Sequence, residues 1–240
     1  GKVLNTEIHE KNFLGKKYKA IKIFVSNYKD AHDIANKINF KEVFKRREYD
    51  LGYITKYIIE KKLKPLCWYE IIGEVLNNSD EFGGIDNVLD CDLCLKVENI
   101  KESKDISFKP KVLAFDIETD KFEIGKGEIL MISIVGDNLK KVITWKGETN
   151  QKFVEKVGSE EELIEKFVSC VKEYSPDILT GYFSDGFDLP YLCARAEKLK
   201  VDFDLGLDKS KPILRRGKIT SVKIKGITHV DLLRFIRIVY

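Results

Sequence analysis

The 240-residue sequence has no long hydrophobic run: none approaches the roughly 18 consecutive apolar residues that a membrane-spanning helix needs. No signal peptide opens the chain. Neither sign of charge dominates, because 42 Lys and Arg residues face 39 Asp and Glu residues, which leaves a formal net charge of +3. We therefore expect an intracellular protein of one large or two small domains, in which a nucleic-acid partner would bind a local basic cluster.

Cysteine and histidine are scarce, with five and three residues respectively. An odd number of cysteines without a secretory signal does not fit a disulfide framework. Cys91 and Cys94 form a Cys-x-x-Cys pair, but the sequence offers no second pair to complete the tetrahedral ligand set of a zinc site. We therefore interpret the cysteines as packing residues in a reducing compartment.

Methionine is rarer still, since Met131 is the single one and the chain begins with Gly1. The last residue, Tyr240, follows an apolar and basic run over 232–238 with no capping Gly or polar tail. These features predict that the sequence is a fragment of a longer chain.

The first half of the sequence predicts an α+β arrangement. Alternating apolar residues predict strands, and apolar residues three or four positions apart predict helices. The expected strands are 17–25, 66–76 and 86–98, and the expected helices are 28–38 and 51–63. The polar stretch 99–110 ends in Pro110 and is interpreted as a linker.

From Lys111 onward the pattern becomes that of a mixed sheet flanked by helices. The continuous apolar run 112–115 predicts a strand covered on both faces. Ser159 and Glu162 form a capping-box pattern at the start of a helix that Pro176 ends. The other expected elements are strands 129–135, 141–145 and 177–180, helices 159–174 and 189–199, and a hairpin of 218–224 with 227–230 around Gly226.

Two acids lie at the end of the apolar strand. Alternation places Asp116 and Glu118 on one face, with Ile117 on the other. Neighbouring carboxylates repel each other, so a cation between them would stabilise the pair, and oxygen ligands suit Mg²⁺ or Mn²⁺. The alternative is that the strand has ended and that both acids face water.

A third acid, Asp188, lies where another strand leads into a helix. Pro190 fits the first turn of that helix, which places Asp188 at or just before the N-cap. Asp188 either only caps the helix or meets Asp116 and Glu118 at the edge of one sheet. Clefts at strand ends are where α/β proteins commonly form their sites.

Segments 115–119 and 181–191 resemble the first and second motifs of the DEDD-type 3′→5′ exonuclease domain of family-B DNA polymerases. The resemblance extends over nearly the whole chain and is to archaeal members. Further exonuclease segments that resemble the family are 125–134, 142–146, 176–178, 194–199 and 226–232. Segments that resemble the N-terminal domain of the same polymerases are 13–16, 48–50 and 57–65.

The resemblance implies an α/β fold, with a ribonuclease H-like mixed sheet and flanking helices preceded by a smaller α+β N-terminal domain. It places part of that N-terminal domain at residues 1–105. It places the exonuclease domain at 106–240, which is incomplete because the family's third motif, Tyr-x-x-x-Asp, would follow Tyr240.

The resemblance also implies two-metal hydrolysis of the 3′-terminal phosphodiester of DNA, with Mg²⁺ or Mn²⁺ as cofactor. On this basis Asp116 bridges both ions, Glu118 positions one ion and the terminal nucleotide, and Asp188 binds the second ion. The third motif would supply the fourth carboxylate, and Asp231 is not that motif. We expect this chain alone to have weak or no nuclease activity, whereas the whole protein would be a polymerase with proofreading.

Contacts to DNA should combine stacking with phosphate binding, because proofreading must accept any sequence. The candidate residues in the exonuclease region are Tyr182, Phe183, Phe187, Arg215 and Arg216. Phe183 stands where the family commonly has Asn, and core packing is its alternative role. Asp185, beside Gly186, is assigned to the turn.

The first half adds a basic stretch, with Lys45, Arg46 and Arg47 as candidates for DNA binding and a solvated face as the alternative. Archaeal relatives sense template uracil in their N-terminal domain. The residues that resemble part of that pocket are Leu51, Tyr53 and Lys56, whereas Tyr28 and Ala31 stand where Pro and Val are expected.

The resemblance implies as partners a single-stranded 3′ end of DNA, a primer-template, the rest of the polymerase chain and, as a candidate, a sliding clamp. It implies no membrane partner and a nucleoid-associated location in the cytoplasm. Two other functions stay open: a non-catalytic nucleic-acid-binding module, and a stand-alone DEDD nuclease acting on RNA or DNA.

Overall fold

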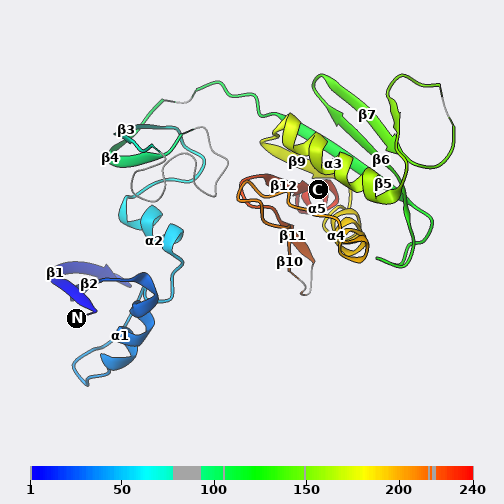
Figure 1. The fold of residues 1–240 in the computed structure, drawn as a ribbon. Coiled ribbons are helices and arrows are strands. Elements are labelled where there is room, and N and C mark those ends of the chain that lie inside the picture. Colours follow the sequence, from blue (N-terminus) through cyan, green and yellow to red (C-terminus); the bar gives the residue numbers. More distant parts are fainter. Residues whose placement is uncertain are drawn as a thin grey trace. The chain divides into compact units, whose positions relative to one another are not determined.

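The computed structural model describes residues 2–77, 93–104, 106–148, 150–215, 217 and 220–239 (Figure 1). The chain divides into two compact units, Gly1–Trp68 and Tyr69–Tyr240. The domain boundary that the sequence predicts after residue 105 lies within the second unit and stays a prediction.

The first unit begins with an antiparallel hairpin of β1 (Val3–Phe13) and β2 (Lys16–Val25). A 3₁₀ turn, η1 (Tyr28–Asp30), leads into α1 (Ala31–Lys37), and α2 (Tyr53–Glu60) follows. The predicted strand and both predicted helices of this region are confirmed. Sequence reasoning missed β1, because its residues are exposed at nearly every position and show no apolar period.

The second unit opens with a two-stranded antiparallel sheet of β3 (Tyr69–Val75) and β4 (Leu95–Glu102). The predicted strand 66–76 is confirmed. The linker prediction is wrong for residues 99–102, because β4 runs to Glu102 and pairs with β3 over this polar segment; Glu70 and Lys101 are register partners of opposite charge, which favours the pairing. Residues 86–92, including Cys91, lie outside the described residues.

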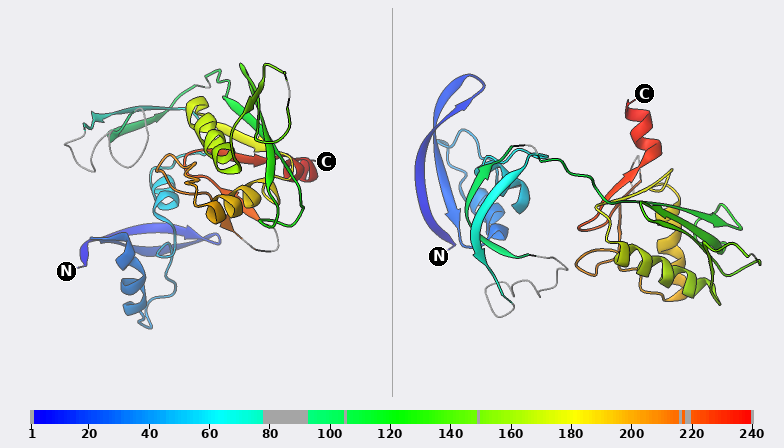
Figure 2. Two further views of the ribbon diagram at one scale, coloured as in Figure 1. Left: turned by 45° about the vertical axis from the view of Figure 1, so that its right-hand side comes forward. Right: turned by 90° about the horizontal axis from the view of Figure 1, so that it is seen from above.

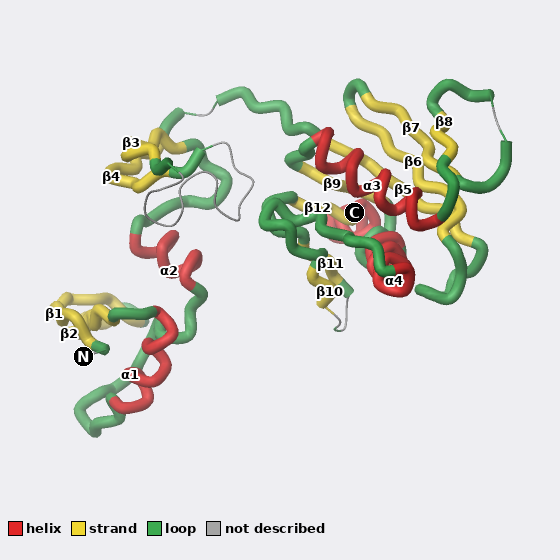
Figure 3. Tube along the Cα trace, in the orientation of Figure 1, coloured by secondary structure: helices red, strands yellow, loops and turns green. Residues whose placement is uncertain are grey.

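A mixed six-stranded sheet forms the centre of the second unit, in the order β12-β9-β5-β6-β7-β8 (Figure 3). β5 pairs antiparallel with β6 and parallel with β9, and β12 extends the parallel part. The strands are β5 (Val112–Thr119), β6 (Ile129–Gly136), β7 (Leu139–Thr144), β8 (Val154–Lys156), β9 (Ile178–Gly181) and β12 (Thr228–Asp231).

One face of β5 packs into the core. Leu113, Phe115 and Ile117 are buried, whereas Val112 is exposed at 36%. The prediction of burial on both faces is therefore wrong. The helices that complete this core are α3 (Glu160–Tyr174), which packs on β6 and β7, and α4 (Asp188–Leu199), which packs on α3.

The start of α3 fixes the position of α4. Glu160 is buried and accepts hydrogen bonds from Arg195 Nε of α4 at 2.7 Å and from the Ile129 N–H of β6 at 2.9 Å. Ser159 Oγ caps the helix by accepting the Glu162 N–H at 3.3 Å. The predicted capping box is only half formed, because the Glu162 carboxylate accepts the Gly158 N–H instead.

The predicted hairpin around Gly226 is wrong, apart from one isolated bridge between Ile224 and Ile227. Instead, β10 (Ile213–Arg215) pairs antiparallel with β11 (Ser221–Lys223), while β12 pairs parallel with β9. The Thr180 hydroxyl of β9 donates to the Val230 carbonyl at 2.8 Å, which adds to this pairing. Helix α5 (Leu232–Val239) projects from the end of β12 (Figure 2).

Candidate nuclease site

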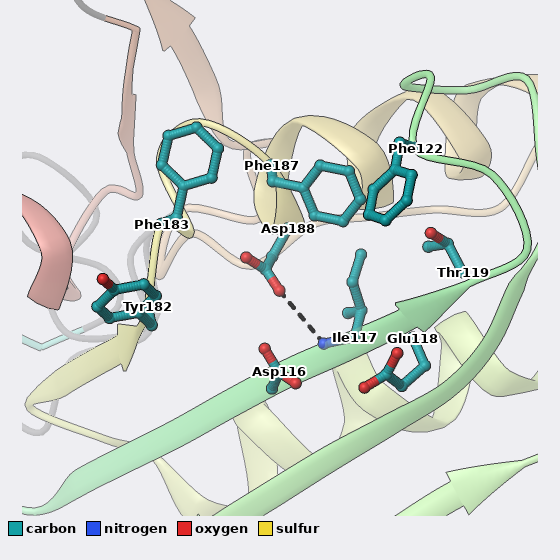
Figure 4. A pocket seen from close by; sticks show the side chains of 9 residues that line it. All are labelled: Asp116, Ile117, Glu118, Thr119, Phe122, Tyr182, Phe183, Phe187 and Asp188. Carbon is teal, nitrogen blue, oxygen red and sulfur yellow. Dashed lines mark hydrogen bonds between the residues drawn. The ribbon is translucent and has the colours of Figure 1, made fainter.

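A cavity of about 270 Å³ opens where β5 passes the end of β9. Its walls come from β5, the loop after it, the loop after β9 and the start of α4 (Figure 4). The lining residues are Asp116, Ile117, Glu118, Thr119, Phe122, Tyr182, Phe183, Phe187 and Asp188. Two neighbouring acids, Asp116 and Glu118, and a third that lies 70 positions later, Asp188, thus line one cavity.

The strand places two of these acids on its exposed face. Asp116 and Glu118 are exposed and Ile117 is buried, so the predicted alternation is confirmed. The pairing of β5 with β9 ends at Ala114 and Thr180, while β5 continues to Thr119. The cavity therefore lies beside the part of β5 that β9 no longer covers.

Asp188 occupies the edge of β5 that this divergence leaves open. Its carboxylate accepts the backbone N–H of Ile117 at 3.2 Å (Figure 4). The N-cap of α4 is Phe187, so Asp188 is the first helical residue, one position later than predicted. Asp188 is 3% exposed and no lysine or arginine lies within ion-pair distance of it among the described residues.

The environment of Asp188 disfavours its ionised form. Burial is the main cause, the negative charge of Asp116 adds to it, and together they raise the pKa of Asp188 to about 6. The hydrogen bond from Ile117 acts in the opposite direction but is weaker. Asp116 and Asp188 therefore interact electrostatically across the cavity, as two acids do that share a site.

The chemistry of the three acids suits a divalent metal ion. Carboxylate oxygens are the ligands that Mg²⁺ and Mn²⁺ prefer, and a cation would relieve the repulsion between Asp116 and Asp188. However, in the part of the chain that the structure describes, no three His, Cys, Asp or Glu side chains are grouped closely enough to hold a metal ion. The convergence of Asp116, Glu118 and Asp188 on shared ions therefore stays a prediction.

Asp231 holds the loop that carries Tyr182 and Phe183 in place. This buried carboxylate accepts the N–H groups of Phe183 and Asp185, each at 3.0 Å, and that of Leu233 at 2.9 Å. Backbone N–H groups thus occupy both oxygens of Asp231, and these bonds connect the loop after β9 to the start of α5.

Asp185 makes a second connection between the same segments. Its carboxylate accepts the Val222 N–H and the Arg234 guanidinium, each at 2.6 Å, and lies 3.3 Å from His229 Nδ1. His229 Nε2 is 2.9 Å from Ser184 Oγ, and burial lowers the pKa of the histidine. Because Ser184 is fully buried, this Ser-His-Asp chain supports the loop and presents no nucleophile.

Phe183 adopts an unusual backbone conformation for its type. Its φ is 61°, in the left-handed region that Asn tolerates better than Phe. Hydrogen bonds to its carbonyl from the N–H groups of Gly186 and Phe187 hold the turn. A Cβ at Gly186 would lie 2.3 Å from the Phe183 ring, so a larger residue there would displace the half-exposed ring.

The cavity has an aromatic rim that includes one residue not predicted. Tyr182 and Phe183 are 58% and 48% exposed, and Phe187 packs beside Phe122 with ring centroids 6.5 Å apart. Phe122 is 91% exposed and lies in a loop without periodic pattern, so no sequence signal marked it. The predicted stacking residues thus line the cavity, which leaves their role in binding DNA a prediction.

The remaining predicted residues that the structure describes lie outside this cavity lining. Arg215 belongs to β10, and Arg216 lies outside the described residues. Two sets belong to the first unit: the basic residues Lys45, Arg46 and Arg47, and the predicted uracil-pocket residues Leu51, Tyr53 and Lys56. The uracil pocket stays a prediction.

The mixed sheet, with an acidic and aromatic-lined cavity beside the part of β5 that β9 leaves uncovered, defines an α/β domain. A family model described as "DNA polymerase family B, exonuclease domain" matches residues 44–240, and the chain belongs to this family. A DNA polymerase of Pyrococcus glycovorans is 34% identical over 98% of this chain and 26% of its own length. For a DNA polymerase of Thermococcus litoralis, the identity is 35% over 98% of this chain and 12% of the relative.

The fold agrees with this assignment. The structure of the family-B DNA polymerase from the archaeon Pyrobaculum calidifontis matches 98% of this chain and 29% of its own chain, with a TM-score of 0.74 and 23% identity. The predicted fold class is therefore confirmed. The chain spans about a quarter of the length of the Pyrococcus glycovorans polymerase and 12% of that of the Thermococcus litoralis polymerase. No helix within the described ranges is long and apolar enough to cross a membrane.

Proposed function

We propose that the cavity is a metal-dependent 3′→5′ exonuclease site that proofreads DNA within a longer polymerase. The observation that carries this proposal is geometric: Asp116 and Glu118 of β5 and the buried Asp188 of α4 line one cavity, and the Ile117 N–H of β5 binds the Asp188 carboxylate. A sheet that only needed stability would gain nothing from burying an acid beside another acid.

The chain's own residues would divide the work. The Ile117 N–H binds the Asp188 carboxylate, and Asp116 and Glu118, on the exposed face of β5, line the same cavity (Figure 4). When bound, Mg²⁺ or Mn²⁺ would supply an activated water and charge stabilisation at the phosphate. Asp116 and Asp188 would hold the ions, and Glu118 would also position the terminal nucleotide.

The aromatic rim would bind the end of the DNA strand. The rings of Phe122, Tyr182, Phe183 and Phe187 line the cavity. Stacking accepts every base, which is what an enzyme that removes any mismatched nucleotide needs. In the whole protein, the partners would be a primer-template and the polymerase region, and the place of action would be the nucleoid.

Metal binding tests the acids directly. We expect isothermal titration to detect Mn²⁺ binding to the 240-residue chain, and Asp116→Asn and Asp188→Asn to weaken it about tenfold or more, because each removes a unit charge near the ion. Asp137→Asn is the matched control, since Asp137 lies in the exposed turn after β6 and pairs with Lys109. Wild-type binding by Asp116→Asn would favour the non-catalytic module.

A nuclease assay then tests the chemistry. With the chain in excess over 5′-labelled single-stranded DNA and with Mn²⁺ present, we expect at most slow shortening from the 3′ end. Asp116→Asn and Glu118→Gln should remove that shortening, whereas Asp137→Asn should not. Robust digestion that survives Asp116→Asn would contradict the proposed site.

A further inference from the structure

A loop over residues 120–128 joins β5 to β6 and carries Phe122 of the cavity lining. Two hydrogen bonds close its base: the Asp120 N–H donates to the Glu128 carbonyl at 3.2 Å, and the Glu128 N–H donates to Asp120 Oδ1 at 2.6 Å. Phe122 is 91% exposed, and its ring lies beside that of Phe187 (Figure 4). The base of the loop is thus fixed, while little protein packs on the Phe122 ring.

Tyr191 of α4 bonds this loop on both sides of Phe122. Its hydroxyl accepts the Gly127 N–H at 3.1 Å and donates to the Lys121 carbonyl at 3.0 Å. Tyr191 has no exposure, and Gly127 is buried as well. A buried N–H needs an acceptor, because leaving it unpaired costs the full desolvation of the group. One hydroxyl therefore bridges the two arms of the loop and ties both to α4.

Gly127 leaves room for this hydroxyl. A Cβ at position 127 would lie 2.7 Å from Tyr191 Oη and 2.1 Å from Asp120 Oδ1. A side chain there would therefore displace the tyrosine or open the base of the loop. The Lys121 carbonyl also accepts the hydroxyl of Thr119 at 3.0 Å. The residues around the Tyr191 hydroxyl are thus arranged to receive it.

The same turn of α4 carries Asp188. Tyr191 follows Asp188 by three residues, so the two side chains share one face of the helix. On that face, Asp188 accepts the Ile117 N–H of β5, while Tyr191 holds the loop that continues from β5. The Phe187 ring lies beside both Tyr191 and Phe122, with centroids 5.3 and 6.5 Å away. The start of α4 therefore fixes one acid of the site and the loop with Phe122 against the same strand.

We propose that Tyr191 is a positioning residue of the nuclease site. Its hydroxyl holds loop 120–128 so that the Phe122 ring stays at the cavity and stacks on the base of the 3′-terminal nucleotide. This inference rests on the proposed function, to which it adds a residue that does not line the cavity and acts through Phe122. A loop without this bond samples more conformations, and ordering it on binding costs affinity.

Tyr174 at the end of α3 provides a matched control. Its hydroxyl donates to the Val112 carbonyl at 3.2 Å and accepts the Asp137 N–H at 3.1 Å. It thus bridges a carbonyl and an N–H group as Tyr191 does, but neither Tyr174 nor its two partners line the cavity. Tyr174→Phe and Tyr191→Phe each remove one bridging hydroxyl and keep the ring, so their comparison separates positioning from a general loss of stability.

Binding of thymidine 5′-monophosphate, the class of product that the proposed reaction releases, tests the proposal. Isothermal titration into the 240-residue chain with Mn²⁺ in excess measures it. Phe122→Ala should weaken binding about 5- to 100-fold, the range for the loss of one stacked base. Tyr191→Phe should weaken it about 2- to 13-fold, the range for ordering one side chain on binding. Tyr174→Phe should leave the affinity unchanged.

The double variant shows how Tyr191 acts. If the hydroxyl works through Phe122, adding Tyr191→Phe to Phe122→Ala should weaken binding no further, whereas independent effects would multiply. Hydrogen exchange gives a readout that needs neither nucleotide nor metal. Peptides that cover 120–128 should exchange faster in Tyr191→Phe than in the wild type, and Tyr174→Phe should not change them.

Failure of this inference differs from failure of the proposed function. If the wild type binds no nucleotide in Mn²⁺, or if Asp116→Asn leaves binding unchanged, the proposed function is overturned and this inference with it. If binding depends on Asp116 but not on the Tyr191 hydroxyl, or if the two effects multiply in the double variant, the role of Tyr191 alone is overturned. Equal weakening by Tyr174→Phe and Tyr191→Phe, or unchanged exchange of 120–128 in Tyr191→Phe, would reduce that role to packing of the unit.

Discussion

The two units of the chain bury their apolar residues very differently. In the second unit, β5, β6, α3 and α4 surround a continuous core in which many side chains have no exposure. In the described part of Gly1–Trp68, Ala35 is the only buried hydrophobic residue. Exposed there are Val3, Leu4, Ile8, Leu14, Tyr18, Ile21, Phe40, Phe44, Tyr53, Ile54, Ile59 and Leu66.

This difference in apolar burial shows how the side chains of each unit are held in position. Burial of apolar surface contributes about 25 cal/mol per Å², so a core can hold β5 and α4 at a fixed separation. Asp116 and Asp188 are placed by that core. The rings of Phe13, Tyr18 and Phe44, in contrast, are held by the pairing of β1 with β2 and by contacts with one another and with Arg47.

Hydrogen exchange tests this contrast at the largest scale. Amides of β5 and β6 should open only with the whole second unit, whereas those of β1 and β2 should open locally. We expect protection factors to differ by about a thousandfold, since local openings cost several kcal/mol less than global unfolding. Mass spectrometry of peptides from 3–25 and 111–136 measures the protection factors. Equal protection would contradict the difference in stability between the two units.

Replacing one aromatic residue in each unit by alanine tests the same difference in burial. Phe167 of α3 has no exposure and packs on Phe115 and Phe203, with centroids 5.3 and 6.2 Å away. Phe167→Ala should lower the free energy of unfolding by about 3–5 kcal/mol, because it leaves a cavity in the core. The matched change Phe44→Ala should cost about 0.5 kcal/mol or less. Urea unfolding followed by circular dichroism compares them, and similar losses would show that Phe44 is a core residue.

The same contrast explains how far the sequence could be interpreted. Where a core exists, apolar periodicity carries the information: α3 and its Ser159 cap, and the alternation of Asp116, Ile117 and Glu118, were predictable. Apolar periodicity does not predict which strands pair with each other. β12 pairs with β9 and not with its chain neighbour β11, and β1 has no apolar period at all.

The candidate site divides along the same line. The three acids could be selected from the sequence, because Asp116 and Glu118 follow the apolar run of a strand and Asp188 starts a helix. Their supports could not, since the contacts of Asp185 with His229 and Arg234 join residues more than 40 positions apart. Phe122 could not either, because a loop residue 91% exposed leaves no pattern.

Acids in the two units should respond to pH in opposite directions, and Asp188 has the larger effect. Its folded pKa of about 6 lies above the ordinary value of 3.8, so the folded state binds the proton more tightly than the unfolded chain. Stability should therefore fall as pH rises from about 4 through 6. Asp188→Asn should remove this loss and stabilise the second unit by about 3 kcal/mol at pH 8, with little effect at pH 3.

Urea unfolding at both pH values measures this effect. A variant that is destabilised equally at pH 3 and pH 8 would contradict the unfavourable ionisation of Asp188. It would show instead that the hydrogen bond from Ile117 requires a carboxylate.

Glu60 of the first unit should show the smallest effect and the opposite sign. The hydrogen bond from Lys22 lowers the pKa of Glu60 below its ordinary 4.5, so the stabilisation is present above pH 4.5 and disappears as pH falls through the folded pKa. Both side chains are well exposed, at 39% and 47%, so Glu60→Gln should cost only about 0.2–1 kcal/mol at pH 7. Exchange of β2 amides measures the loss, which 1 M salt should reduce.

Glu42→Gln, which removes an acid without an ion-pair partner in the described chain, should change nothing. A Glu60→Gln effect as large as that of Asp188→Asn would mean that the first unit holds its charges in a buried environment, against the contrast drawn from its exposed apolar residues.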